Sequence, residues 1–155
     1  MVALIGDWIA NIETIVEVSR RNPLSLLVYR ENGKVTGVVC YLMLRPAGLL
    51  AIATDKFNGV NPDLDMIAGT GEVPLAGYGW ALAAKSRKAA AAVLVGLEKV
   101  RSELYPNIPF FARAATNDGR RVLCGRLRYL PFPRSNTGLL WSPPLHSEEG
   151  AEAAP

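Results

Sequence analysis

A basic turn followed by four alanines is the part of this sequence best suited to bind a phosphate group. Arg87 and Lys88 follow an apolar stretch, residues 76–84, and stand directly before Ala89, Ala90, Ala91 and Ala92. The first backbone N–H groups of a helix lack intrahelical partners and carry the positive end of its dipole. The alanines leave room for a phosphate near the main chain. We therefore predict a pyrophosphate site here; the alternative is an alanine-rich helix with basic residues on its solvated face.

The basic residues of the chain are concentrated around this turn. The 155 residues have a net charge of +3, but residues 85–134 alone hold eleven Lys and Arg against three Asp and Glu. Such a segment attracts phosphate-bearing partners, either nucleic acid or a nucleotide cofactor. Its densest cluster is Arg120, Arg121, Arg126 and Arg128. Aromatic residues do not alternate with these arginines as in a stacking platform, which disfavours nucleic acid.

Length and composition indicate one ordinary globular domain. Half of the residues are hydrophobic and 20% are charged, and a chain of this size builds a core without disulfides or metal. Cys40 and Cys124 lack the spacing of a metal knuckle, so we expect a reduced, cytoplasmic protein with no metal site. The longest apolar run, residues 35–44, is half of the roughly 20 residues that a membrane span needs. The N-terminus does not resemble a signal peptide.

The N-terminal part is predicted to form a helix and a hairpin. Apolar residues spaced by three and four predict a helix over residues 4–20. Asn32-Gly33 suits the positive φ angles of a tight turn, so residues 24–30 and 35–44 are expected to pair as antiparallel strands. The almost continuous apolar character of both strands indicates that both faces are covered.

The remaining segments are predicted to alternate between strands and helices. Strands are expected over residues 49–54, 76–84, 110–115 and 138–141, and helices over residues 87–105 and 116–130. Ser86 is a suitable N-cap for the first of these helices. Residues 55–75 read as a long loop, and such loops are often functional. We expect a single domain over residues 1–141 and a disordered acidic tail over residues 142–155.

Two short patterns in this part of the chain resemble the GCN5-related N-acetyltransferase (GNAT) family. In that family a central strand enters a pyrophosphate loop, Arg/Gln-x-x-Gly-x-Gly/Ala, at the start of a long helix. Arg87, Ala90 and Ala92 stand at its three signature positions. A second family pattern is Asn-x-x-Ala-x-x-Leu-Tyr-x-Lys-x-Gly-Phe, and the identical or similar residues here are Asn117, Leu123, Arg126 and Tyr129. The resemblance covers residues 24–141 and is specific only between residues 76 and 130.

The chain also departs from the family patterns. Ala90 replaces the central glycine of the loop and adds a methyl group where the pyrophosphate passes. Cys124 stands where many members carry the tyrosine that protonates the leaving thiolate, and Arg128 replaces the glycine before the final aromatic residue. The predicted N-terminal helix takes the place of the strand and two helices with which the family normally begins. These changes bear more on catalysis than on the fold.

The resemblance implies an α/β (α+β) fold with a mixed, mostly antiparallel central sheet flanked by helices. It implies an acyl-CoA-dependent N-acyltransferase that uses acetyl-CoA or another acyl-CoA. The acceptor would be an amine of a small molecule or a protein, attacking directly in a ternary complex. Backbone amides around Leu82 and Ala84 would hold the pantetheine arm and polarise the thioester carbonyl. The complete predicted cofactor site is Leu82, Ala84, Arg87, Lys88, Ala89, Ala90, Ala91, Ala92 and Asn117.

Three side chains are candidates for the proton transfers of such a reaction. Glu72 and Tyr78 lie just before and on the central strand, where a base would deprotonate the amine. Cys124 is the candidate acid for the leaving thiolate. Each has a structural alternative, namely an exposed loop carboxylate, a half-buried strand aromatic and an inert core cysteine.

Other functions remain open at this point. A GNAT-like domain that has lost catalysis would serve as a cofactor or partner sensor, and the missing glycine and tyrosine favour this alternative. Asp55, Asp63, Asp65 and Glu72 would suit a cationic amine acceptor. Trp8 and an exposed sheet edge would suit a homodimer.

Overall fold

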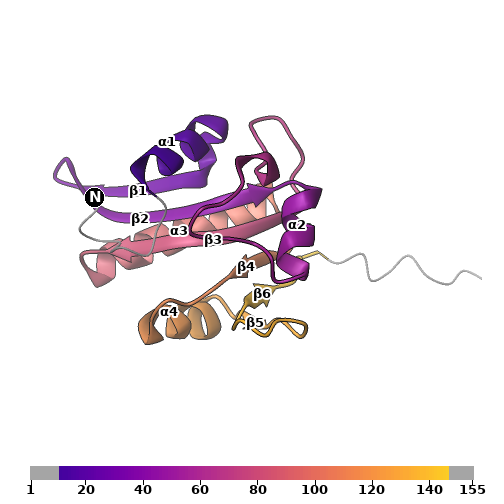
Figure 1. Ribbon diagram of the computed structural model, residues 1–155. Helices are drawn as coiled ribbons and strands as arrows, with labels where there is room; N and C mark the ends of the chain where they lie inside the picture. The colour runs from indigo at the N-terminus through magenta and orange to yellow at the C-terminus, as the bar shows by residue number, and fades with distance from the viewer. Residues whose placement is uncertain (1–10, 147–155) are drawn as a thin grey trace, which may run out of the picture.

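The computed structural model describes residues 11–146, which form a six-stranded mixed sheet with helices on both faces (Figure 1). In chain order the elements are α1 (Ile12–Arg21), β1 (Leu26–Glu31), β2 (Lys34–Leu44), α2 (Pro46–Ala53), β3 (Ala76–Ala84), α3 (Arg87–Leu104), β4 (Phe110–Ala112), α4 (Asn117–Arg121), a π-helix (Val122–Arg126), β5 (Leu130–Pro131) and β6 (Leu140–Ser142). The strand order is β1-β2-β3-β4-β6-β5. Among the described strands only β3 and β4 are parallel neighbours, so the predicted mixed, mostly antiparallel sheet is confirmed.

The predicted N-terminal hairpin is confirmed in both strands and turn. Asn32 and Gly33 have φ angles of 50° and 77°, the left-handed values that a tight two-residue turn requires. The last eight residues of β2 are all buried. This matches the expectation that its apolar run is covered on both faces.

Two layers of helices cover the sheet. Tyr41 and Met43 of β2 face one core cluster, which α3 and the π-helix complete, while Leu42 and Leu44 face the other, which α1 and α2 complete. Gly37 lets α3 approach the sheet closely, because a Cβ atom there would lie 3.1 Å from the carbonyl oxygen of Ala89. The start of α3 is thereby fixed against β2.

The predicted strand over residues 49–54 is wrong, since these residues belong mostly to helix α2. Pro46 occupies the first turn of α2, where its missing N–H costs nothing and its fixed φ suits a helix. Gly48 packs against Leu44, with its missing Cβ 2.9 Å from the carbonyl oxygen of Met66. A short apolar run is compatible with either a strand or a buried helix, so periodicity could not separate the two.

The ends of other elements differ from the prediction. Helix α1 begins after Asn11, whose side chain accepts a hydrogen bond from the N–H of Thr14 (2.9 Å), and residues 4–10 of the predicted helix lie outside the described residues. Strand β6 includes Ser142, and the N–H of Leu145 donates to Pro106 (2.7 Å). Of the predicted tail, residues 147–155 lie outside the described residues. The predicted helix over 116–130 is divided into α4 and the π-helix and ends at Arg126, and Leu130 belongs to β5 instead.

Candidate functional site

Strand β3 is paired on both sides in its first half and on one side in its second half. It pairs with β4 only at Gly77, Tyr78 and Gly79, whereas its pairing with β2 continues to Ala84. The register with β2 skips Trp80, because Cys40 pairs with Ala81 and Tyr41 with Gly79. An extra residue of this kind is a β-bulge, which bends and twists the strand that carries it. The bulge therefore lies where β3 stops pairing with β4.

The open edge of β3 carries the backbone groups of the two predicted pantetheine-binding residues. The N–H of Lys85 donates to the carbonyl oxygen of Thr36 (2.8 Å), so Lys85 directs its backbone groups toward β2. Direction alternates along an antiparallel strand. Leu82 and Ala84 therefore direct their N–H and C=O groups away from β2. No other strand pairs with these residues within the part of the chain that the structure describes.

Helix α3 begins three residues after β3 ends. Ser86 is its N-cap, as predicted, and its side chain accepts from the N–H of Ala89 (3.0 Å). The carbonyl oxygen of Ser86 accepts from the N–H of Ala90 (2.9 Å). The N–H groups of Arg87 and Lys88 have no acceptor among the described residues. These two unpaired donors lie at the N-terminus of α3, which is the positive end of the helix dipole.

The two basic side chains at the start of α3 differ in whether they are free to bind a ligand. Lys88 forms an ion pair with Glu31 at the end of β1 (Nζ–Oε1 3.0 Å), and the hydrogen bond that Lys88 donates to Glu31 raises the pKa of Lys88. Arg87 is exposed and makes no ion pair within residues 11–146. Of the alanines, Ala89 is fully buried against the sheet, whereas Ala91 is exposed. Residues three and four apart are neighbours on a helix surface, so the half-buried Ala90 and the exposed Ala91 are the small residues beside Arg87, while Ala92 is half-buried further round the helix.

The second family pattern lies on α4 and the π-helix. Asn117 is the exposed first residue of α4, and Thr116 caps this helix by accepting from the N–H of Gly119 (3.0 Å). Cys124 lies in the π-helix and packs against the core cluster of Tyr41 and Phe110. Arg128 has a φ of 58°. Left-handed backbone is what glycine adopts without strain, and glycine is what the family pattern has at this position.

Tyr78 and Glu72 lie in different surroundings. Tyr78 is 5% exposed and packs against Phe57, with ring centroids 4.9 Å apart. Glu72 forms an ion pair with Arg45, with 2.7 Å between its Oε2 and Nε of Arg45. The hydrogen bonds from Arg45 lower the pKa of Glu72, which weakens it as a base. Glu72 also precedes the paired end of β3, so the structure does not bring it to the open edge.

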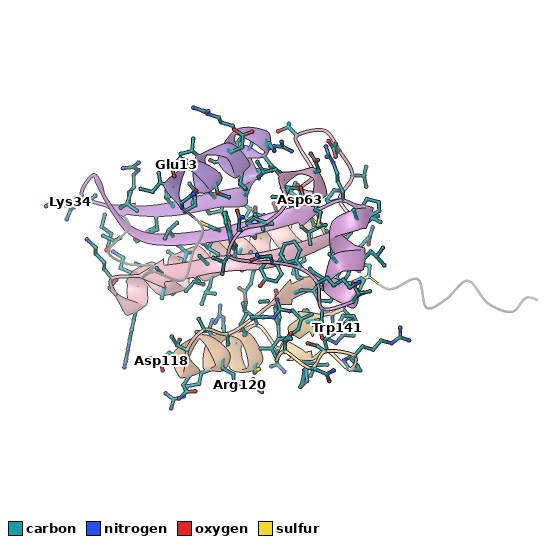
Figure 2. The ribbon with its side chains drawn as sticks, in the orientation of Figure 1. Glu13, Lys34, Asp63, Asp118, Arg120 and Trp141 are labelled. Atoms are coloured by element: carbon teal, nitrogen blue, oxygen red, sulfur yellow. The ribbon has the colours of Figure 1, made fainter. Side chains whose placement is uncertain are left out.

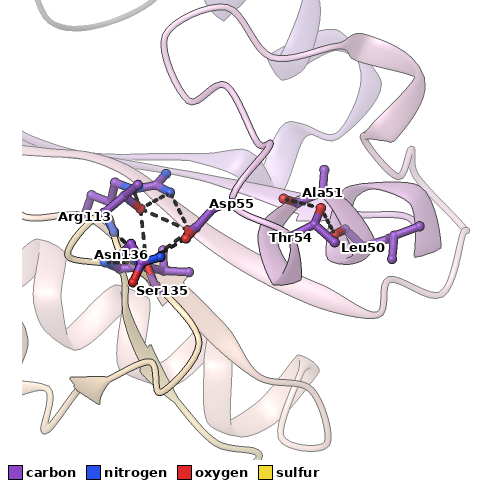
Figure 3. A network of polar contacts seen from close by, with 9 residues as sticks. Leu50, Ala51, Thr54, Asp55, Arg113, Ser135 and Asn136 are labelled. Carbon is purple, nitrogen blue, oxygen red and sulfur yellow. Dashed lines mark hydrogen bonds and ion pairs between the residues drawn. The ribbon is translucent and has the colours of Figure 1, made fainter.

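Two long-range contacts, one made by Trp80 and one by Asp55, were not predicted from the sequence. The indole N–H of Trp80 donates to the carbonyl oxygen of Gly59 (2.6 Å), and Asp55 binds the loop between β5 and β6 (Figure 3). From the sequence, Asp55 is expected only to suit a cationic amine, together with the other acidic residues of its loop. A positive φ of 54° at Asp55 is a backbone feature that no residue pattern revealed.

Residues 11–146 contain no group of three His, Cys, Asp or Glu side chains placed to hold a metal ion. No helix in this range is both long and apolar enough to cross a lipid bilayer. The chain matches no protein-family model and no curated protein sequence.

Proposed function

We propose that this protein is a GNAT-like N-acyltransferase that transfers an acetyl or other acyl group from coenzyme A to an amine. The observation that carries the proposal is that free backbone N–H groups on the edge of β3 are followed directly by free N–H groups at the start of α3. The open edge at Leu82 and Ala84 continues within three residues into the free N–H groups at the start of α3. A ligand with amide groups at one end and a pyrophosphate at the other matches this order.

The residues present fit an acyl-CoA in most respects. The amides of a pantetheine arm would pair with Leu82 and Ala84 as a short added strand does. A pyrophosphate would lie at Arg87 and Lys88, with Ala90 beside it. The order and pairing of the described strands support the family resemblance, because the central strand leads into the long helix and separates from its parallel neighbour. Arg128 supports it as well, since it has left-handed backbone at the glycine position of the second pattern.

Bound acyl-CoA would supply an activated acyl thioester at the open edge of β3. The backbone N–H groups of Leu82 and Ala84 would hold the carbonyl in place and stabilise the negative charge that develops on its oxygen. A base must take a proton from the amine as the C–N bond forms, and an acid must protonate the thiolate as the C–S bond breaks. Tyr78 lies next to the point of strand separation and is the better placed of the two base candidates. Cys124, at the pattern's tyrosine position, remains the candidate acid.

A cofactor-binding sensor without catalysis is the second candidate function. The N–H of Ala89 is already occupied by the side chain of Ser86 (3.0 Å), and Ala90 carries a methyl group in place of the pattern's glycine. Both features weaken a pyrophosphate site without abolishing it. A sensor would bind acyl-CoA and show no turnover with any amine.

Nucleic-acid binding has less support. Arg121 is paired with Asp118 and Arg126 with Glu98, each at 3.3 Å. Asp118 and Arg120 are both exposed on α4 (Figure 2), so acidic and basic side chains are mixed on this helix. We also propose that the protein is located in the cytoplasm and forms a homodimer. Cys40 and Cys124 are free thiols, which agrees with a reducing compartment.

Thermal unfolding with acetyl-CoA tests the proposal. At 100 times its dissociation constant, a ligand stabilises the folded state by about 2.7 kcal/mol, which raises the melting temperature by several degrees. We expect Arg87→Glu with Ala90→Glu to abolish the shift. Val95→Glu with Lys99→Glu makes the same charge change further along α3 and should retain it. No shift with acetyl-CoA or a longer acyl-CoA in the unmodified protein would reject both the acyltransferase and the acyl-CoA sensor.

A further inference from the structure

The segment from Asp55 to Gly59 lies against β3 where β3 and β4 separate. The carbonyl oxygen of Gly59 accepts from the indole N–H of Trp80 (2.6 Å), and Trp80 is the bulged residue. A Cβ atom at Gly59 would lie only 2.9 Å from the hydroxyl oxygen of Tyr78. Phe57 packs on the ring of Tyr78 and is 6% exposed. The segment therefore covers the last residues of β3 that pair with β4 and the first residue that does not.

The same segment is bound at its start to the end of β4. Asp55 forms an ion pair with Arg113 (3.6 Å), which directly follows β4. Its carboxylate also accepts from the hydroxyl groups of Ser135 (3.0 Å) and Thr137 (3.1 Å) and from the N–H of Asn136 (3.0 Å) (Figure 3). These hydrogen bonds, above all the one from Asn136, lower the pKa of Asp55. Asp55 thus connects three segments that are far apart in the sequence.

The groups around Asp55 occupy most of the acceptor positions of its carboxylate. A carboxylate has about four acceptor positions, and Asp55 accepts three hydrogen bonds, from Ser135, Asn136 and Thr137, and forms an ion pair with Arg113. Arg113 is held in turn by Thr137, with 2.8 Å between Nη2 and Oγ1. Asp55 therefore serves as a structural anchor for the segment that it begins.

The two attachments of the segment lie on opposite sides of the strand separation. Gly59 is bound to β3 through Trp80, and Asp55 is bound to the end of β4 through Arg113. Phe57 and Tyr78 belong to the core cluster on the face opposite α3, whereas the pyrophosphate site lies at the start of α3. The segment therefore closes the separation from the side that an acyl-CoA does not occupy.

We propose that residues 55–59 form the acceptor-side wall of the acyl-transfer site, and that Asp55 is the positioning residue that holds this wall closed. The inference rests on the proposed function. An amine must pass this wall to reach the thioester, so the wall selects acceptors by size and limits the access of water. Water that reaches the thioester carbonyl carbon breaks the C–S bond and releases a carboxylic acid and the free thiol of coenzyme A.

Loosening the wall should therefore raise hydrolysis without weakening acyl-CoA binding. Asp55→Asn removes the charge and places an amide opposite the donors, and Trp80→Phe removes the second attachment while keeping an aromatic ring. We expect each variant to hydrolyse acetyl-CoA roughly fivefold faster, because small losses of local stability change the open population by such factors. The acetyl-CoA dissociation constant should stay within about twofold of the unmodified value, because the backbone of residues 82–88 is untouched. Glu17→Gln, which breaks an exposed ion pair with Arg21 on α1, is the matched control.

The measurements are thiol release, acetyl-CoA binding by calorimetry and amide hydrogen exchange of residues 56–61, all on the full chain. Faster thiol release and faster exchange in both variants, with unchanged binding and an unchanged control, would support the wall. If acetyl-CoA binds but the variants release thiol at the unmodified rate, the wall is rejected and the proposed function stands. If the unmodified protein does not bind acetyl-CoA, the proposed function fails, and with it the acceptor role of the segment. A merely structural role for Asp55 would lower the melting temperature and leave thiol release unchanged.

Discussion

The two halves of β3 differ in what lies beside them. The first half, Ala76 to Gly79, has β2 on one side and β4 on the other, and its first three residues are buried. The second half, Trp80 to Ala84, has β2 alone, and most of its residues are partly exposed. One strand thus places its packing contacts at one end and its free hydrogen-bonding groups at the other. The comparison teaches that the fold and the proposed function can be perturbed separately.

The first half is defined by close packing against β4. A Cβ atom at Gly77 would lie 2.6 Å from the ring of Phe110, and one at Gly79 would lie 3.3 Å from the Cβ of Ala112. Phe110 is 1% exposed, so its ring has nowhere to move. Glycine at position 77 is therefore needed for space and not for an unusual φ.

The largest expected effect is on stability, from Gly77→Val. The added side chain overlaps a buried ring, and overpacking of this kind costs about 3 kcal/mol. Urea denaturation followed by circular dichroism should show a lower midpoint with an unchanged slope. Gly125→Ala is the control, because a Cβ atom there meets nothing within 4 Å. Equal stability of Gly77→Val and the unmodified protein would show that β4 is not packed as closely as described.

A smaller effect is expected in the second half, from Ser86→Ala. Loss of the hydroxyl that caps α3 costs about 1 kcal/mol. The same change frees the N–H of Ala89, which a pyrophosphate would use. The melting temperature should fall while the affinity for acetyl-CoA rises or is unchanged, and Ser102→Ala near the end of α3 should change neither by as much. A parallel loss of stability and affinity would contradict the separation of the two halves.

Local signals in the sequence predicted the elements better than their contacts. Asn32-Gly33 and Ser86 act within a few residues, so the hairpin and the start of α3 were predictable. The bulge at Trp80 is decided by the register between β2 and β3, which residue patterns do not encode. The candidate site shows the same difference between local and long-range features. The turn that leads to Arg87 was predictable because it depends on neighbouring residues. The anchor at Asp55 depends on residues 58 or more positions away in the chain.

A modest gain in stability is expected from Arg128→Gly, between the π-helix and β5. Left-handed backbone costs a non-glycine residue about 1 to 2 kcal/mol, and part of this is offset by the greater freedom of glycine in the unfolded chain. The net gain should be about 0.5 kcal/mol, visible as a higher melting temperature. Arg126→Gly, in the π-helix, should lower it. A fall in the melting temperature of Arg128→Gly would show that its side chain makes a stabilising contact that outweighs the backbone strain.

The smallest expected effect concerns pH and lies at the paired end of β3. The hydrogen bonds from Arg45 lower the pKa of Glu72 in the folded state below its ordinary value of 4.5. A lowered folded pKa means that this ion pair contributes stability above pH 4.5 and loses that contribution as the pH falls through the folded value. Glu72→Gln should therefore be slightly less stable than the unmodified protein at pH 7, and the difference should become smaller as the pH falls below 4.5. Because the pair is exposed, added salt should shrink the difference at pH 7 as well. Urea midpoints at pH 7 and at pH 3 measure it, and a difference as large at pH 3 as at pH 7 would mean that the glutamate side chain stabilises the loop by packing rather than by its charge.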